Sequence, residues 1–443
     1  MRPSILFMKY IYLLPVVFVI LEGCSNDDMI SDPQDYNKFL QEGVTEKKSE
    51  EIGKQIFFWQ SRLQKDTGNY VDMLQLAVCY LKVFDLKGGV KYLNLADSFL
   101  KKSSEKLNHT NPEILFAISQ NKISQHRFQD AAYYVHAAER AGADQYTTSL
   151  LRFDTEIEIG AMVSAKENLR SIRQQESFDC LIRRAKLEDQ EGNAVMAIHL
   201  MEQAFLKVKN GKKELYCWAL SNLADMYGHA GRIKDAYDAY LAVLERDNSY
   251  LHALKGIAWI AFSHDKNATE AARIYKYILS EKKAPELLLV LAEMEEWRQN
   301  EELKKDYIQQ FLREMKDPCY GNMYNKYLLS VYTDEMQDFE RALRIAENET
   351  HERPTPETYD WLAWTYFARN ETANALGIIN NFVYKRNFEP TALWHMATIF
   401  ASVGKTAKAK ELLQECLKYS FELGPLKTKR IKEQFNKLLM LQR

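Results

Sequence analysis

The chain has 443 residues with 59 basic and 61 acidic side chains, and its formal net charge of −2 argues against nucleic acid as the main partner. Glycine and proline are scarce, at 17 and 10 residues, whereas 46% of residues are hydrophobic, which suits long helices with short turns and excludes extensive disorder. The six cysteines show no CxxC spacing, which excludes an ordinary zinc or disulfide framework.

Residues 1–23 have the pattern of an export signal, with basic residues followed by an apolar run over residues 11–21 that is too short to span a bilayer. The end of this segment, Leu21-Glu22-Gly23-Cys24, resembles a bacterial lipobox, although Glu22 departs from the small residue usual there. The resemblance implies cleavage before Cys24 and acylation of that cysteine, as in palmitate-bearing lipoproteins. A signal peptide cut elsewhere is the alternative.

The stretch after the cysteine, Ser25-Asn26-Asp27-Asp28, looks like the acidic signal that directs some lipoproteins of the Bacteroidetes group to the cell surface. We therefore expect a lipid anchor in the outer membrane. The anchored protein could face either the periplasm or the cell exterior. Residues 24–46 are polar and without sustained period, which predicts a flexible tether. An apolar stripe in residues 47–69 then predicts a leading helix: Ile52, Ile56, Trp59 and Leu63.

Residues 216–249 contain two helical patterns separated by a glycine. The first places apolar residues at i, i+3, i+4 and i+7, and the second has a similar stripe: Leu220, Leu223, Ala224 and Tyr227, then Ile233, Ala236, Tyr240 and Val243. Gly231 between them accepts the left-handed conformation that ends a helix. The unit is predicted to be a helical hairpin.

This pattern resembles a tetratricopeptide repeat (TPR), and its small second-helix residue recurs at about 34 residues or a multiple of that period. The recurring positions are Ala131, Ala165, Ala197, Ala236, Ala271, Ala342, Ala375 and Ala409. The resemblance implies an all-α, right-handed superhelical solenoid of antiparallel helix pairs, with about ten repeats over residues 70–420. Residues 421–443 carry a closing apolar stripe and several lysines, which predicts a capping helix or, alternatively, contact with anionic lipid or an acidic partner.

Catalytic signatures are absent from the sequence. It contains no HExxH motif, and its nine histidines lack metal-ligand spacing, so we expect no metal, no cofactor and no enzymatic activity. A hydrolase built on carboxylates without evident partners is a minor alternative.

Aromatic residues are the main candidates for a binding surface. In the TPR family the concave groove is lined by set first-helix positions, and the resemblance puts seven aromatic residues there: Trp218, Trp259, Phe262, Trp297, Trp364, Phe367 and Trp394. Exposed aromatics of this kind are typical binding anchors. The alternative is that neighbouring helices bury these rings as ordinary core.

These features together predict a membrane-anchored scaffold that binds a protein or peptide segment in an aromatic-lined groove. The second hypothesis is a surface lipoprotein that binds glycans during carbohydrate uptake. Fold alone does not decide between them, because function resides in the site rather than in the scaffold.

Overall fold

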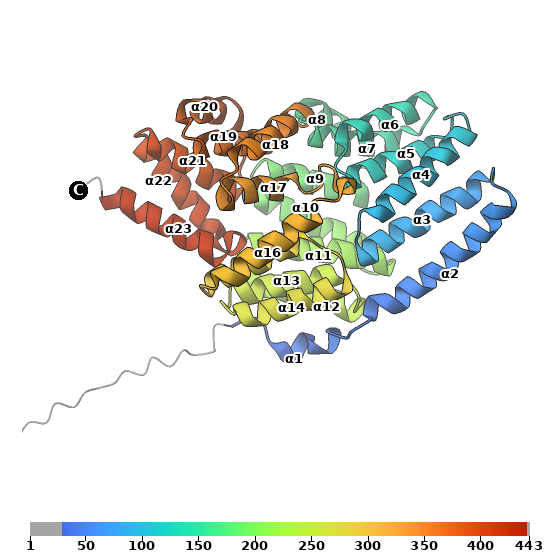
Figure 1. Cartoon of the computed structure of the whole chain (residues 1–443). Coiled ribbons are helices and arrows are strands. Elements are labelled where there is room, and N and C mark those ends of the chain that lie inside the picture. Colours follow the sequence, from blue (N-terminus) through green and yellow to red (C-terminus); the bar gives the residue numbers. More distant parts are fainter. Residues whose placement is uncertain (1–28, 441–443) are drawn as a thin grey trace, which may run out of the picture.

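The computed structural model describes residues 29–440, and the regular elements of that part are helices apart from one isolated bridge between Gly88 and Lys283 (Figure 1). Residues 1–28, including the predicted signal peptide and Cys24, lie outside the described residues. A leading helix, α2 (Val44–Lys65), packs on the first pair of the solenoid.

Ten antiparallel helix pairs follow one another along the chain, which confirms the predicted all-α solenoid. The first five are α3 (Tyr70–Lys87) with α4 (Lys91–Lys106), α5 (Pro112–Ser124) with α6 (Phe128–Arg140), α7 (Gln145–Glu158) with α8 (Met162–Ser171), α9 (Phe178–Gln190) with α10 (Ala194–Val208), and α11 (Lys213–His229) with α12 (Ile233–Arg246). The next five are α13 (Leu251–Ser263) with α14 (Ala268–Glu281), α15 (Glu286–Trp297) with α16 (Glu301–Glu314), α17 (Asn325–Ser330) with α18 (Phe339–Glu352), α19 (Pro356–Ala368) with α20 (Thr372–Ile378), and α21 (Pro390–Ser402) with α22 (Thr406–Cys416).

Two helices extend as π-helical turns, α17 through Val331–Glu335 and α20 through Ile379–Val383. The chain ends in α23 (Ser420–Met440), which is kinked at Gly424 and Pro425.

The small residues that mark the repeat lie where the paired helices cross. Ala236 and its seven equivalents are all buried, at 0–1% exposure, and so are the matching first-helix alanines such as Ala224 and Ala258. A larger side chain at such a crossing costs about 1–3 kcal/mol, because close packing leaves no free volume. The spacing of these alanines therefore predicted the crossing points.

The prediction of a flexible tether over residues 24–46 is wrong for residues 29–46. This segment contains α1 (Pro33–Tyr36) and a 3-10 turn (Asn37–Phe39), and it lies along α12–α14 at the bottom of Figure 1. The Asp265 carboxylate accepts hydrogen bonds from the backbone N–H groups of Ile30 and Ser31, each at 3.0 Å. Tyr36 and Phe39 are buried, so two apolar rings in a polar segment hold it on the body.

The solenoid coils back on itself after about five and a half pairs. In Figure 1 the orange helices α17 and α18 lie beside the teal and green helices α7–α9, which are about 195 residues earlier in the chain. We call this contact between successive superhelical turns the seam. It joins the turn inside each early pair to the link between two later pairs.

Glycines stand at four places along the seam. A Cβ built on Gly88 would lie 2.1 Å from the Lys283 carbonyl oxygen, and one on Gly160 would lie 2.4 Å from the Pro354 carbonyl oxygen. At Gly192 and Gly228 a Cβ would instead meet the aromatic rings of Phe388 and Phe421, at 2.9 and 2.7 Å. A side chain at Gly88 or Gly160 would push the two turns apart, because the neighbouring atoms there are backbone.

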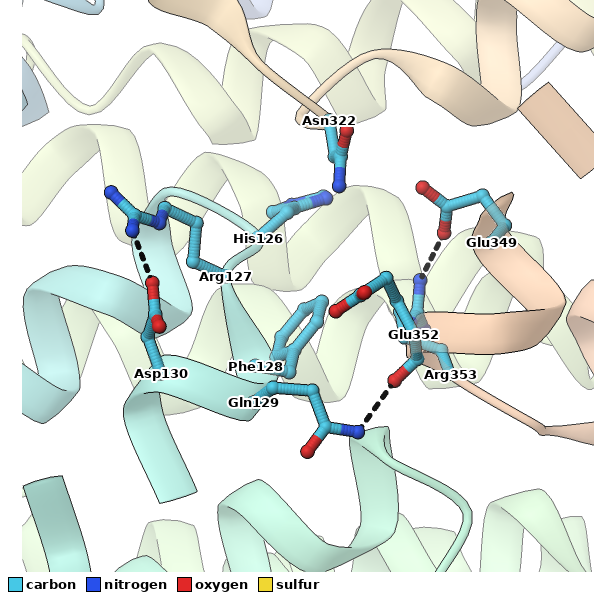
Figure 2. Close-up of a pocket in the computed structure, with 9 residues that line it drawn as sticks. All are labelled: His126, Arg127, Phe128, Gln129, Asp130, Asn322, Glu349, Glu352 and Arg353. Carbon is cyan, nitrogen blue, oxygen red and sulfur yellow. Dashed lines mark hydrogen bonds and ion pairs between the residues drawn. The ribbon is translucent and has the colours of Figure 1, made fainter. Parts of the chain in front are cut away.

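A polar cavity of about 140 Å³ lies in the seam (Figure 2). Its walls come from the start of α6 and the end of α18, and Asn322 closes one side. Both guanidinium groups in it are already paired, Arg127 with Asp130 and Arg353 with Glu349. The cavity is therefore part of the seam's polar contact and offers no unpaired guanidinium to a ligand.

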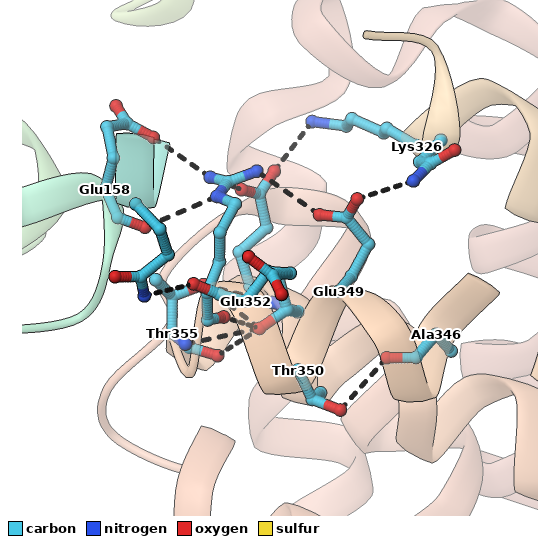
Figure 3. A network of polar contacts seen from close by, with 12 residues as sticks. Glu158, Lys326, Ala346, Glu349, Thr350, Glu352 and Thr355 are labelled. Carbon is cyan, nitrogen blue, oxygen red and sulfur yellow. Dashed lines mark hydrogen bonds and ion pairs between the residues drawn. The ribbon is translucent and has the colours of Figure 1, made fainter. Parts of the chain in front are cut away.

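Arg353 connects the two turns across the seam through an ion pair with Glu158, which is labelled in Figure 3. Its Nη2 lies 2.9 Å from Oε2 of Glu158, its guanidinium carbon lies 4.7 Å from the centre of the Phe128 ring, and Glu349 and Glu357 complete its shell. Only 13% of the Arg353 side chain is exposed, so these charges attract one another with little screening by water.

Gly160→Ala tests the seam against a matched control, Gly231→Ala. Both glycines have positive φ, +78° and +77°, but a Cβ on Gly231 would meet nothing within 4 Å. Gly231→Ala carries only the left-handed penalty of about 1–2 kcal/mol. Gly160→Ala is expected to lower the free energy of unfolding by about 1–3 kcal/mol more, because the turns must shift. Denaturant unfolding followed by circular dichroism measures both, and equal losses would contradict the seam.

Candidate interaction surface on the inner helices

The predicted groove residues lie at three separate places. Trp218 is on α11, where its ring meets Phe178 edge-on with centroids 5.9 Å apart and remains 39% exposed. Trp259, Phe262 and Trp297 lie around α13 and α15. The other three are on α19 and α21.

The middle group contacts the C-terminal helix. Trp259 is half-buried and donates its indole N–H to the Phe421 carbonyl oxygen at 3.0 Å, and Ser263 donates to the same oxygen from one turn further along α13. Phe262 is fully buried and Trp297 packs on the same core. Trp259 is therefore engaged by α23, whereas Phe262 and Trp297 belong to the core beside it.

Helix α23 does more than cap the last repeat. Its stripe of Leu423, Ile431 and Leu438 is buried, and the helix packs on α22 and also on α11, α13 and α15 of the preceding superhelical turn. Gly424 has a φ of +74°, and a Cβ there would lie 3.0 Å from Trp259. The sequence showed the apolar stripe but not the second set of helices, because that contact depends on how far the solenoid coils.

The last group forms a stacked aromatic set, which we call the Trp364 cluster: Trp364, Phe367, Trp394 and His395. The Trp364 and His395 rings are nearly parallel, at 10°, with centroids 4.1 Å apart, and Trp394 lies 5.9 Å from Trp364. The side chains of Trp364, Phe367 and Trp394 are half-buried, whereas His395 is buried. The cluster is the largest stacked set among the predicted groove residues, and sequence reasoning missed only His395, which directly follows Trp394.

Hydrogen bonds fix three of the four rings of the cluster, and the fourth, Phe367, stacks on Trp364 with ring centroids 5.5 Å apart. Trp364 donates to Asp334 Oδ1 at 2.9 Å, and Trp394 donates to Gln434 Oε1 of α23 at 2.9 Å. His395 Nδ1 lies 2.9 Å from Oδ2 of the buried Asp360. Rings held in this way lose little rotamer entropy when a partner covers them, which favours binding.

Carboxyl groups near α23 have raised pKa values. Burial raises the pKa of Glu293, whose Oε1 is buried without a hydrogen-bond partner among residues 29–440 and would lie 3.1 Å from a Cβ on Gly424. Burial, and then the charge of Glu422, raises the pKa of Glu389 to about 7. The folded state therefore holds protons here that the unfolded chain releases at lower pH.

Metal and membrane features were sought in the same part of the chain. Residues 29–440 hold no group of three or more His, Cys, Asp or Glu side chains that could bind a metal ion. Among the helices that the structure describes, none has both the length and the apolar character required to cross a bilayer. The expected absence of a metal and of a cofactor stays a prediction.

Known proteins resemble this chain in structure alone. No family model matches it, and no curated protein does. A tetratricopeptide repeat protein from Parabacteroides merdae is similar with a TM-score of 0.35 and 18% identity, over 60% of this chain and 99% of its own. Yeast Tom70 is similar with a TM-score of 0.34 and 15% identity, over 93% of this chain and 91% of its own. The human IFIT1 dimer with PPP-AAAA is similar with a TM-score of 0.44 and 12% identity, over 70% of this chain and 71% of its own.

These likenesses concern the fold. The chain is an all-α, TPR-like solenoid of consecutive antiparallel helix pairs.

Glu293→Gln tests the electrostatics beneath α23. Because the folded state keeps the Glu293 proton above the ordinary carboxyl pKa of 4.5, the free energy of unfolding falls as pH rises above 4.5. The neutral amide removes this contribution, so the variant is expected to gain stability relative to wild type as pH is raised from 5 to 8. Melting temperatures across that range measure the difference, and parallel curves for the two proteins would contradict it.

Proposed function

We propose that the protein is a lipid-anchored, non-enzymatic scaffold that binds a protein or peptide segment at the Trp364 cluster. The observation that carries this proposal is a set of stacked, half-exposed rings fixed by hydrogen bonds. Tryptophan is enriched among residues that dominate binding energy, and such anchors act best when their neighbours already hold them in place.

The other predicted groove residues have different parts in this proposal. Trp259 holds α23 by its hydrogen bond, and Phe262 and Trp297 pack in the neighbouring core, so these three support the shape of the surface rather than meet the partner directly. Trp218 and Phe178 form a smaller exposed pair on α11 and α9. The partner is therefore expected to depend on Trp364 and Trp394 far more than on Trp218.

Anchoring rests on the resemblance of Leu21-Glu22-Gly23-Cys24 to a lipobox. Acyl chains on Cys24 would hold the body at the outer membrane, since each buried methylene contributes about 0.8 kcal/mol. The periplasmic face and the cell surface are both compatible with this proposal.

Glycan binding is the alternative, since half-exposed tryptophans also stack on sugar rings. One face of the Trp364 ring is covered by the His395 imidazole at 4.1 Å, which leaves less flat surface for a sugar. The protein partner is therefore the better-supported proposal. Tryptophan fluorescence titrated with polysaccharides distinguishes the two.

Trp364→Ala tests the binding site, with Trp218→Ala as the matched control. We expect Trp364→Ala to reduce capture of the partner at least tenfold, because loss of a central anchor costs about 2 kcal/mol or more. Trp218→Ala is expected to leave capture unchanged. Cross-linking in intact cells followed by quantitative pull-down compares the two variants with wild type.

Both variants must first show the far-ultraviolet circular dichroism of wild type. If a well-folded Trp364→Ala variant captures the same proteins in the same amounts, the cluster is not the binding site.

A further inference from the structure

The docked N-terminal segment determines where a lipid anchor can lie. Ile30 and Ser31 are held by the Asp265 carboxylate in the turn between α13 and α14. Only five residues lie between Cys24 and Ile30, and over these six steps a fully extended chain spans at most about 3.3–3.6 Å per residue. An acylated Cys24 is therefore within about 20 Å of the α13–α14 turn, so the membrane must lie close to that end of the body.

A basic surface lies at the same end. On α23 the residues Lys429, Lys432 and Lys437 are exposed, and their spacing places them on the outward face, opposite the buried Ile431 and Leu438. Within the described part of the chain none of these three lysines is paired with a carboxylate. Glu433 is the only acidic residue among them.

The basic face and the chain's exit are neighbours. Lys266 follows Asp265 in the α13–α14 turn, and after burial the charge of Lys432 is the next cause that lowers the Lys266 pKa. Arg430 of α23 forms an ion pair with Glu296 of α15, which fixes α23 against α15. Figure 1 shows α23 and the start of the described chain on the same side of the molecule.

We propose that the outward face of α23, with Lys429, Lys432 and Lys437, rests on the anionic headgroups of the membrane in which the protein is anchored. This inference rests on the proposed anchoring at Cys24. The short connection brings the lysine face to the headgroups, and the lysines then set the orientation of the body. Each lysine near an anionic surface raises partitioning about fivefold, so three together give about a hundredfold.

The experiment separates the anchor from the face. In cells, Cys24→Ser is expected to abolish incorporation of labelled palmitate into the protein, and unchanged incorporation would refute the anchor alone. In vitro, the chain from Ser25 onward, which contains every described residue, is mixed with vesicles of phosphatidylethanolamine and phosphatidylglycerol at low salt, and bound protein is measured by co-sedimentation.

Two charge-matched variants identify the face. One carries Lys429→Glu, Lys432→Glu and Lys437→Glu on α23, and the other carries Lys47→Glu, Lys54→Glu and Lys65→Glu on α2, where the lysines are equally exposed. We expect at least a hundredfold loss of vesicle binding for the α23 variant and little loss for the α2 variant. Vesicles of phosphatidylcholine alone should bind neither.

Equal losses in the two variants would mean that net charge and not this face governs binding, and would overturn the proposal. Absence of wild-type binding to the anionic vesicles would also overturn it and would leave an acidic protein as the partner of α23. Thermal melts of both variants show whether they are folded.

Discussion

Close approach of backbone to backbone across the seam is the constraint on which the rest of the structure depends. The solenoid returns to its own earlier helices after about 195 residues, and at Gly160 the carbonyl of Pro354 occupies the place that a side chain would take. Arg353 then adds a shielded ion pair to Glu158 across the same contact. In an elongated repeat array each repeat touches only its neighbours. Stacking of successive superhelical turns adds contacts between residues that are far apart in the sequence.

The seam also determines which inner residues are available to a partner. Because the turns are stacked, α23 reaches back to α13 and α15, and the indole N–H of Trp259 is taken by the Phe421 carbonyl oxygen. The aromatic rings Trp364, Phe367 and Trp394 further along the chain are half-buried, and Trp364 stacks on His395 and donates a hydrogen bond to Asp334. Among the predicted groove residues, the Trp364 cluster is therefore separate from Trp218 and from the rings beside α23.

Local features of the fold followed from sequence, and distant contacts did not. Ala236 and its equivalents predicted the helix crossings because the 34-residue period and the need for a small residue are both local. The close contact of Gly160 with Pro354 could not be predicted from the sequence, because the superhelical pitch is a sum of small rotations over many repeats. The segment around Tyr36 was predicted to be flexible from its polar composition, although two aromatic residues there were a signal that it packs. The anchor at Cys24 and the binding role of Trp364 stay predictions.

The most direct test of the stacked turns is a site-specific cross-link across the seam. Gln129 donates a hydrogen bond to the Glu352 carbonyl oxygen at 2.8 Å, and both side chains lie at the seam cavity of Figure 2. With cysteines at these two positions and a short bismaleimide, the stacked structure predicts an intramolecular cross-link, identified by mass spectrometry, at dilute protein concentration. Full labelling of both cysteines without any cross-link would show that the turns are apart in solution and would contradict the account.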